Sequence, residues 1–120
     1  MNKIKSFEDI LAWQKARELN KVIYKITQNS QFDKDFDLKR QIRRASVSIS
    51  SNIAEGFERD TDKEFKRFLY ISKASCAEVR SQLYLASDLD YINSVDFEDL
   101  SLKTIVISRL LGSFIKYLKK

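Results

Sequence analysis

The sequence of 120 residues contains no histidine and only one cysteine, Cys76. Without histidine the chain cannot form a nucleophile–histidine pair, a histidine zinc site or a histidine general base, and one cysteine cannot close an internal disulfide. Gly56 and Gly112 stand alone, so there is no glycine-rich phosphate loop. An enzyme based on carboxylates or lysines alone is left open, but no such constellation is present. The sequence therefore predicts a protein that is not an enzyme and that holds no cofactor or metal.

Proline is absent and glycine occurs only twice, against usual frequencies of ~5% and ~7%. Sandwiches and barrels need many tight turns, so the scarcity of both residues favours long helices. No apolar run reaches the ~18 residues of a membrane span, and the first residues lack the apolar core of a signal peptide. A single cysteine with apolar flanks is typical of a reducing compartment. We therefore expect a cytoplasmic protein without a membrane anchor.

Apolar residues recur at spacings of three and four in four segments, which predicts helices over about 7–28, 38–55, 62–89 and 97–118. Thr61 and Glu64 form a capping box at the start of the third segment, and Gly56 is placed to end the second in the left-handed conformation. The first link contains Phe32 and Phe36, which we expect to fold back onto the bundle. Short links make consecutive helices antiparallel neighbours. The prediction is one all-α domain over residues 1–120, an antiparallel up-and-down four-helix bundle.

The second predicted helix is poor in charge, since Glu55 is the one charged residue between Ala45 and Gly56. Small and apolar residues wrap over more of its circumference than one core face needs, and small residues let helices approach closely. The pattern predicts that this helix contacts its own bundle on one side and another subunit, or a closely packed neighbour, on the other, through Val47, Ser50, Ser51 and Ala54. Asn52 and Glu55 are candidates for a buried polar pair that sets register.

A basic cluster precedes the small residues, in the stretch "LKRQIRRA". Its like charges lie four residues apart and repel by a few tenths of a kcal/mol, which bound phosphates would relieve. Arginine suits phosphate because its planar fork donates two hydrogen bonds at once. The candidate phosphate contacts are Lys39, Arg40, Arg43 and Arg44. The alternative is that nearby carboxylates neutralise the cluster, namely Asp33, Asp35, Asp37, Glu55 or Glu58.

Three stretches of the sequence resemble the 23S rRNA intervening-sequence protein family: "LAWQKARELNKVIYKIT" (11–27), "QIRRASVSISSNIAEGFER" (41–59) and "KEFKRFLYISKASCAEVRSQL" (63–83). The family consists of small bacterial four-helix bundles, and it is similar to the accessory protein of diversity-generating retroelements. The resemblance implies a homopentamer with a basic surface. It implies no established activity.

The net charge of +5 is compatible with an anionic partner but does not require one. Two hypotheses follow. In the first, an oligomer presents its arginines to the phosphates of RNA or DNA with little base specificity. In the second, a homopentamer is a scaffold that docks a protein partner, such as a reverse transcriptase.

Overall fold

The computed structural model describes residues 4–118, which form one 3-10 helix and five α-helices. Their bounds are η1 (Phe7–Asp9), α1 (Leu11–Ile26), α2 (Ser30–Lys34), α3 (Phe36–Phe57), α4 (Asp62–Asp88) and α5 (Ser94–Leu118). The predicted all-α fold is confirmed, because these residues contain no strand, and the four long helices α1, α3, α4 and α5 fit a bundle. None of the helices described is long and apolar enough to cross a membrane.

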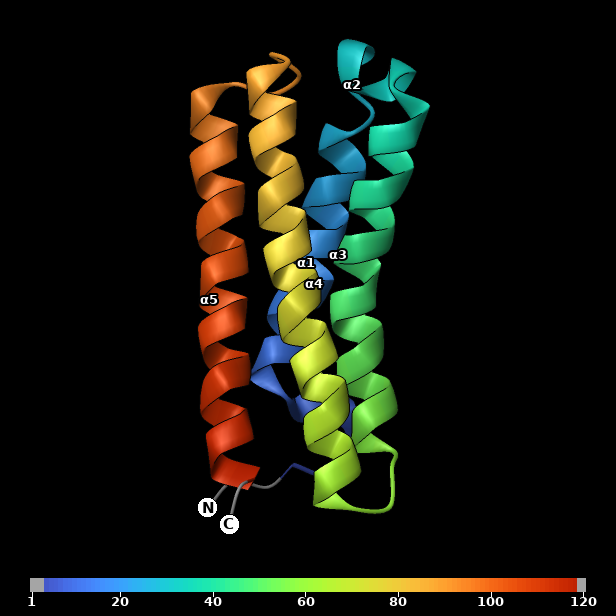
Figure 1. Ribbon diagram of the computed structural model, residues 1–120, viewed down its shortest axis with the longest axis vertical. Helices are drawn as coiled ribbons and strands as arrows, with labels where there is room; N and C mark the ends of the chain where they lie inside the picture. Colours follow the sequence, from blue (N-terminus) through green and yellow to red (C-terminus); the bar gives the residue numbers. More distant parts are fainter. Residues whose placement is uncertain (1–3, 119–120) are drawn as a thin grey trace.

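Each long helix packs against the one before it, and α1 also packs against α5. Figure 1 shows α1 rising to α2 at the top, α3 descending from there, α4 returning upward and α5 descending to the C-terminal end. The described residues extend 45 × 22 × 19 Å. Because α1 packs against both α3 and α5, α1 and α3 form one side of the molecule, and α1 and α5 form an adjacent side.

The core consists of the predicted apolar stripes. On α3 the stripe residues are all at most 3% exposed: Ile42, Ala45, Ile49 and Ile53. On α4 the residues that recur at spacings of three and four are buried: Phe65, Phe68, Ser72, Cys76, Val79, Leu83 and Ala86. Side chains three and four residues apart share one face of a helix, so each stripe points to the bundle axis. The periodicity of the sequence therefore located the core faces of α3 and α4 correctly, whereas on α5 the predicted Ile105 is only half-buried and Ile107 is buried instead.

Two local predictions differ from the structure in the first half of the chain. The first helix is interrupted at Ile10, which is extended (φ −81°, ψ 121°) between η1 and α1. The first link holds the short helix α2, where Phe32 is fully buried but Phe36 is 63% exposed. Only one of the two phenylalanines therefore folds back onto the bundle.

Gly56 does not end the second helix in the left-handed conformation. It lies inside α3, which continues to Phe57, and no described glycine has a positive φ. A Cβ on Gly56 would lie 2.7 Å from the Cβ of Phe68 and 2.9 Å from the Cδ1 of Phe65. The glycine is therefore needed because α4 approaches α3 too closely for a side chain. The N-cap of α4 is as predicted, since the hydroxyl of Thr61 accepts from the Glu64 amide at 3.1 Å, but the Glu64 carboxylate contacts Arg67 instead of completing the capping box.

Candidate functional site

Arg43 joins α3 to the C-terminal end of α1. Its Nε donates to the Thr27 hydroxyl at 2.8 Å, its Nη2 donates to the Tyr24 carbonyl at 3.2 Å, and its guanidinium carbon lies 4.2 Å from the centre of the Tyr24 ring. The last turn of a helix has free carbonyls and the negative end of the dipole, so a cation is favoured there. Arg43 remains half-exposed, and its hydrogen-bond partners are neutral. No carboxylate among the described residues forms an ion pair with it.

The other three predicted contacts differ in how far the chain neutralises them. Lys39 is largely covered and donates to Asp33 at 2.8 Å, and this hydrogen bond and charge hold the pKa of Asp33 below its ordinary value. Arg40 lies 3.8 Å from Asp37, but both are exposed, and such pairs contribute little. Arg44 is exposed and has no ion pair or hydrogen bond with any residue that the structure describes. A carboxylate thus neutralises Lys39, neutral groups of α1 bind Arg43, and Arg44 has no partner among the described residues.

The neighbouring helix α1 adds cations that the sequence analysis missed. Arg17, Lys21 and Lys25 are exposed and four residues apart, so they form a row along α1. The row flanks Asn20 and Tyr24, both of which contact α3. The spacing of four was visible in the sequence. Without knowing which side of α1 meets α3, it could not be joined to the arginine cluster.

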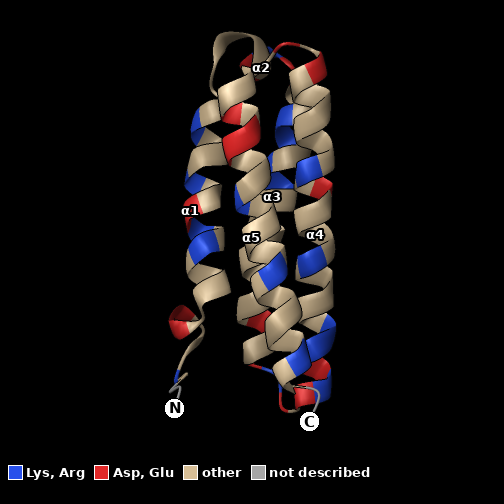
Figure 2. Cartoon of the chain, turned by 90° about the vertical axis from the view of Figure 1, so that its left-hand side faces the viewer, with Lys and Arg blue, Asp and Glu red and all other residues tan. Residues whose placement is uncertain are grey.

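We define the α1–α3 basic face as these six cations, three from each helix: Arg17, Lys21, Lys25, Arg40, Arg43 and Arg44. Among residues 4–118, Asp37 is the one carboxylate that forms an ion pair with any of them. The single acid of α1, Glu18, lines a hollow toward α5 instead. Figure 2 shows blue cations along α1, with the red acids of η1 below them. Six cations of two adjacent helices therefore share a single ion-paired carboxylate among the described residues.

The small residues of α3 mainly serve packing within the chain. The Ser46 hydroxyl donates to the side-chain oxygen of Asn20 at 2.7 Å, and the Asn20 amide donates to Ser50 at 3.0 Å, so both serines face α1. Between α3 and α4, the Ser75 hydroxyl donates to the Ser48 hydroxyl at 3.0 Å. These bonds satisfy buried hydroxyls where the helices are close. Ser50 is thus a close-packing residue inside the chain.

The remaining predicted interface residues lie at the surface of the single chain: Val47 and Ser51 are exposed and Ala54 is half-buried. A subunit contact there stays a prediction. Glu55, one member of the predicted buried pair, is exposed in the single chain. Asn52 is half-buried and donates to the Ser48 carbonyl at 2.8 Å, within its own helix.

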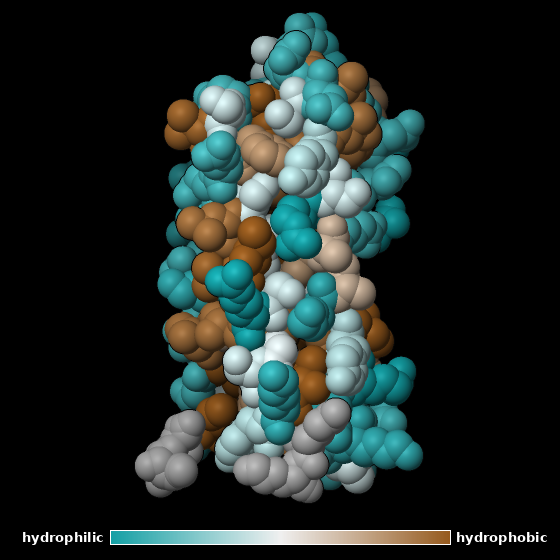
Figure 3. Space-filling view, turned by 60° about the vertical axis from the view of Figure 1, so that its left-hand side comes forward, coloured by the Kyte–Doolittle hydropathy of each residue, from teal (hydrophilic) through white to brown (hydrophobic). Residues whose placement is uncertain are grey.

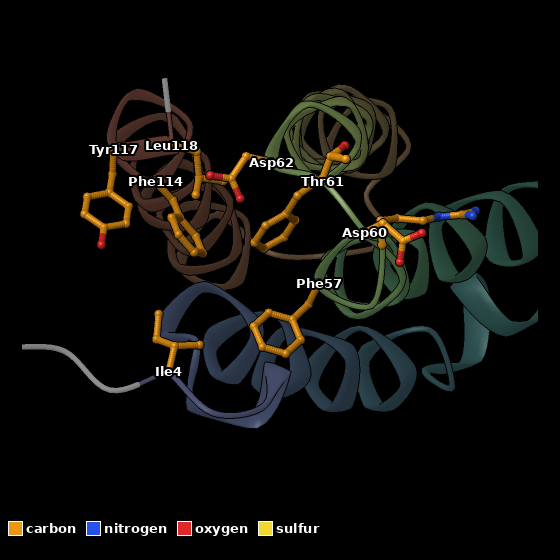
Figure 4. A pocket seen from close by; sticks show the side chains of 10 residues that line it. Ile4, Phe57, Asp60, Thr61, Asp62, Phe114, Tyr117 and Leu118 are labelled. Atoms are coloured by element: carbon orange, nitrogen blue, oxygen red, sulfur yellow. The ribbon is translucent and has the colours of Figure 1, made fainter. Parts of the chain in front are cut away.

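A hollow of about 310 Å³ lies at the end of the bundle near the α3–α4 link. Figure 4 shows Phe57 of α3 and Phe114 of α5 on its walls, with Ile4 on the far side. Phe65 packs edge-on against both rings, with centroid separations of 5.9 Å and 5.3 Å. The carboxylates near it, Asp60 and Asp62, belong to the link and the first turn of α4. No group of metal-ligating side chains occurs among the described residues. We therefore take the α1–α3 basic face as the candidate site.

Comparison with known proteins agrees with the fold. A solved structure from Bacteroides thetaiotaomicron, described as a protein of unknown function from the S23 ribosomal protein family, is similar with a TM-score of 0.82 and 29% identity. The similarity covers 88% of this chain and 96% of that one. No curated protein matches the sequence. The model of the 23S rRNA-intervening sequence protein family matches residues 8–113. The chain therefore belongs to the 23S rRNA-intervening sequence protein family.

Proposed function

We propose that this protein, an antiparallel up-and-down four-helix bundle, is not an enzyme and binds the phosphates of RNA or DNA through the α1–α3 basic face. One observation carries the proposal: of the six cations on that face, five have no carboxylate ion-pair partner within residues 4–118. Like charges held on adjacent helices repel one another, and bound phosphates relieve that repulsion. The family's link to 23S rRNA genes is consistent with a nucleic-acid partner.

The arrangement favours backbone contacts over base readout. Cations four residues apart on α1 are about 6 Å apart along the helix axis, and they lie on a convex helix surface. Phosphate contacts fix position and supply affinity, whereas sequence is read by side chains that enter a groove. The exposed Tyr24 ring already stacks on Arg43. We therefore expect binding that depends steeply on salt and little on sequence.

The test is fluorescence anisotropy with labelled duplexes of ~20 base pairs, one RNA and one DNA, between ~50 and ~200 mM salt. The variant Arg17→Glu/Arg44→Glu reverses one exposed cation on each helix. We expect affinity to fall at least about tenfold. The slope of log affinity against log salt should become shallower by about 2, because each lost phosphate contact removes ~0.9.

The matched control is Arg109→Glu/Lys116→Glu, which makes the same charge change at two exposed positions of α5. It should retain most of the affinity. An equal loss in both variants would mean that net charge rather than the basic face drives binding. Absence of any binding at ~50 mM salt to either duplex would refute the proposed function.

A second function is favoured by the large apolar side chains that α5 exposes. In this alternative the protein is a homopentameric scaffold that docks a protein partner, such as the reverse transcriptase docked by the similar retroelement accessory protein. Five chains of 14.1 kDa give a mass of about 70 kDa. A protein that still co-purifies after nuclease treatment would favour this function over the first.

A further inference from the structure

Tyr24 of α1 and Arg43 of α3 form a fixed pair on the α1–α3 basic face, the Tyr24–Arg43 pair. The guanidinium carbon of Arg43 lies 4.2 Å from the centre of the Tyr24 ring, which is a direct cation–π contact. The hydrogen bonds of Arg43 to the Thr27 hydroxyl and to the Tyr24 carbonyl hold the guanidinium in this position. The Thr27 hydroxyl itself donates to the Ile23 carbonyl at 2.8 Å. The ring and the guanidinium are therefore in place before any ligand binds.

The Tyr24–Arg43 pair keeps groups that can bind a ligand. Arginine has five N–H donors, and Arg43 uses one on Nε and one on Nη2 for its bonds within residues 4–118, so three remain. Tyr24 is 41% exposed, and its hydroxyl forms no hydrogen bond with any residue that the structure describes. A guanidinium donates to phosphate oxygens, and both aromatic rings and guanidinium planes stack on bases. The pair therefore offers the two kinds of contact that one nucleotide needs.

A second aromatic ring lies on the same side of α1. Trp13 and Tyr24 are eleven residues apart, close to three helical turns, so they share one side of α1 and lie about 16 Å apart along its axis. Between them, the guanidinium carbon of Arg17 lies 5.8 Å from the centre of the Trp13 ring. Trp13 is half-buried beside η1, whose Glu8 and Asp9 repel phosphates. The main stacking position is therefore the more exposed Tyr24.

Aromatic rings and cations thus alternate along this side, a pattern typical of surfaces that bind single-stranded nucleic acid. In chain order, α1 contributes Trp13, Arg17, Lys21, Tyr24 and Lys25. The side on which α5 comes forward is different, because Figure 3 shows brown apolar side chains there, and its exposed Val95, Leu102 and Val106 are aliphatic. Aliphatic side chains have no π-face on which a base can stack.

Base pairing decides whether the rings can be used. In a duplex the faces of the bases are covered by neighbouring bases, so a convex helix surface reaches mainly the phosphates. In a single strand the faces are available, and each base stacked on a protein ring raises the affinity about fivefold or more. A duplex carries one charge per ~1.7 Å, more densely than a single strand, so phosphate contacts alone would favour the duplex. Stacking and charge therefore predict opposite preferences.

We propose that the α1–α3 basic face binds unpaired nucleotides in preference to paired ones, with a base stacked on the Tyr24–Arg43 pair and a phosphate bound by Arg43. The inference rests on the proposed function and names the strand form that the same site takes, whether RNA or DNA. A duplex remains a weaker ligand that contacts only the cations. Stacking accepts every base, so the preference for a single strand requires no particular sequence.

The test compares ligands that share a backbone, using fluorescence anisotropy and the wild-type protein at ~100 mM salt. A labelled strand of ~15 thymidines is measured alone, annealed to its adenosine complement, and as a strand of equal length with abasic sites in place of the bases. We expect the single strand to bind about tenfold more tightly than the duplex or the abasic strand, which keeps its phosphates but has nothing to stack. A strand of ~15 uridines and its duplex repeat the test for RNA.

Variants of Tyr24 connect the preference to the ring. Tyr24→Leu removes the π-face but no charge, so it should bind the single strand at least about fivefold more weakly and the duplex like the wild type. Tyr24→Phe keeps the ring and should bind both like the wild type. The matched control is Tyr70→Leu, because Tyr70 is 51% exposed on α4, away from the basic face. Circular dichroism checks that each variant is helical, and if Tyr24→Leu is unfolded, the abasic strand decides.

The outcomes separate this inference from the proposed function. No binding of any strand at ~50 mM salt would overturn both. A duplex or an abasic strand that binds as tightly as the single strand would overturn the inference alone and leave phosphate binding by the cations. The same conclusion would follow if Tyr24→Leu and Tyr70→Leu bound the single strand equally well.

Discussion

At the scale of single residues, Gly56 shows how close packing can override local conformation. The sequence suggested a helix-ending glycine, but the residue is helical, and the Phe68 Cβ occupies the space where its side chain would lie. We predict that Gly56→Ala destabilises the protein. Overpacking costs about 1–3 kcal/mol, and the better helix propensity of alanine returns only about 1 kcal/mol. The melting temperature should fall by several degrees in a thermal scan.

Gly112→Ala is the control for this prediction. The nearest atom to its added Cβ would be the Cε of Lys73 at 3.6 Å, which is an ordinary contact with a flexible side chain. This substitution inside α5 should leave the stability unchanged or raise it by up to about 1 kcal/mol. If Gly56→Ala melted as high as Gly112→Ala, the close approach of α3 and α4 would be disproved.

Cys76 gives a second prediction at this scale. Burial raises the pKa of its thiol to about 12, although Lys73 and Arg80 oppose the shift. The thiolate is the reactive form, so we expect no labelling by a maleimide at pH 8 in the native protein and complete labelling in denaturant. The free thiol should also favour unfolding at alkaline pH, since its proton is held more tightly in the folded state. Rapid labelling without denaturant would show that the thiol is accessible.

At the scale of elements, patterns within one helix were predicted well and contacts between segments were not. The predicted range 62–89 corresponds to α4 at Asp62–Asp88, because its N-cap Thr61 and its apolar positions lie within a single stretch of chain. The short helix α2 was not predicted, because a contact with a distant segment of the chain stabilises it. Phe32 is fully buried, and its ring centroid lies 5.2 Å from that of Tyr91 in the α4–α5 link. No pattern within residues 29–37 contains that partner.

The hydrogen bond between Tyr91 in the α4–α5 link and Asp35 at the start of α3 can be tested by varying the pH. The Tyr91 hydroxyl donates to the Asp35 carboxylate at 2.9 Å, and Asp35 also caps α3 by accepting from the Leu38 amide. The hydrogen bond to Asp35 is the main reason that the pKa of Tyr91 is raised. A raised pKa gives stability below the unfolded value, near 10, that is lost as pH rises through the folded value. We predict that Tyr91→Phe melts below the wild type at pH 7 and that the difference shrinks by pH 11.

The variant differs from the wild type only in the Tyr91 hydroxyl, so the difference between the two proteins isolates that group. Equal melting temperatures at pH 7 would mean that the hydrogen bond contributes nothing. A difference in melting temperature that stays constant up to pH 11 would mean that the contribution of Tyr91 to stability does not depend on the proton of its hydroxyl.

At the scale of the whole molecule, the sequence predicted which residues carry charge but not which charges share a side. The cluster from Lys39 to Arg44 was evident, yet Lys39 is neutralised by Asp33 and Arg43 is bound by Tyr24 of another helix. The α1 cations on the same side belong to a segment about twenty residues earlier in the chain. Their register against α3 depends on tertiary contacts, such as those of Asn20 with Ser46. The residues of a surface on a helical bundle come from more than one helix, so the sequence of one helix predicts only some of them.

The proposed homo-oligomer leads to a prediction about the length of the nucleic acid. If several chains assemble, the assembly carries several basic faces, and a long nucleic acid can engage more than one of them. Linked sites raise the apparent affinity by 10²–10⁴ without any new contact. We therefore predict that the wild type binds a duplex of ~60 base pairs at least about tenfold more tightly than one of ~10 base pairs. Arg17→Glu/Arg44→Glu should weaken both. Equal affinity of the wild type for the two duplexes would contradict the prediction, since one basic face would then account for all of the affinity.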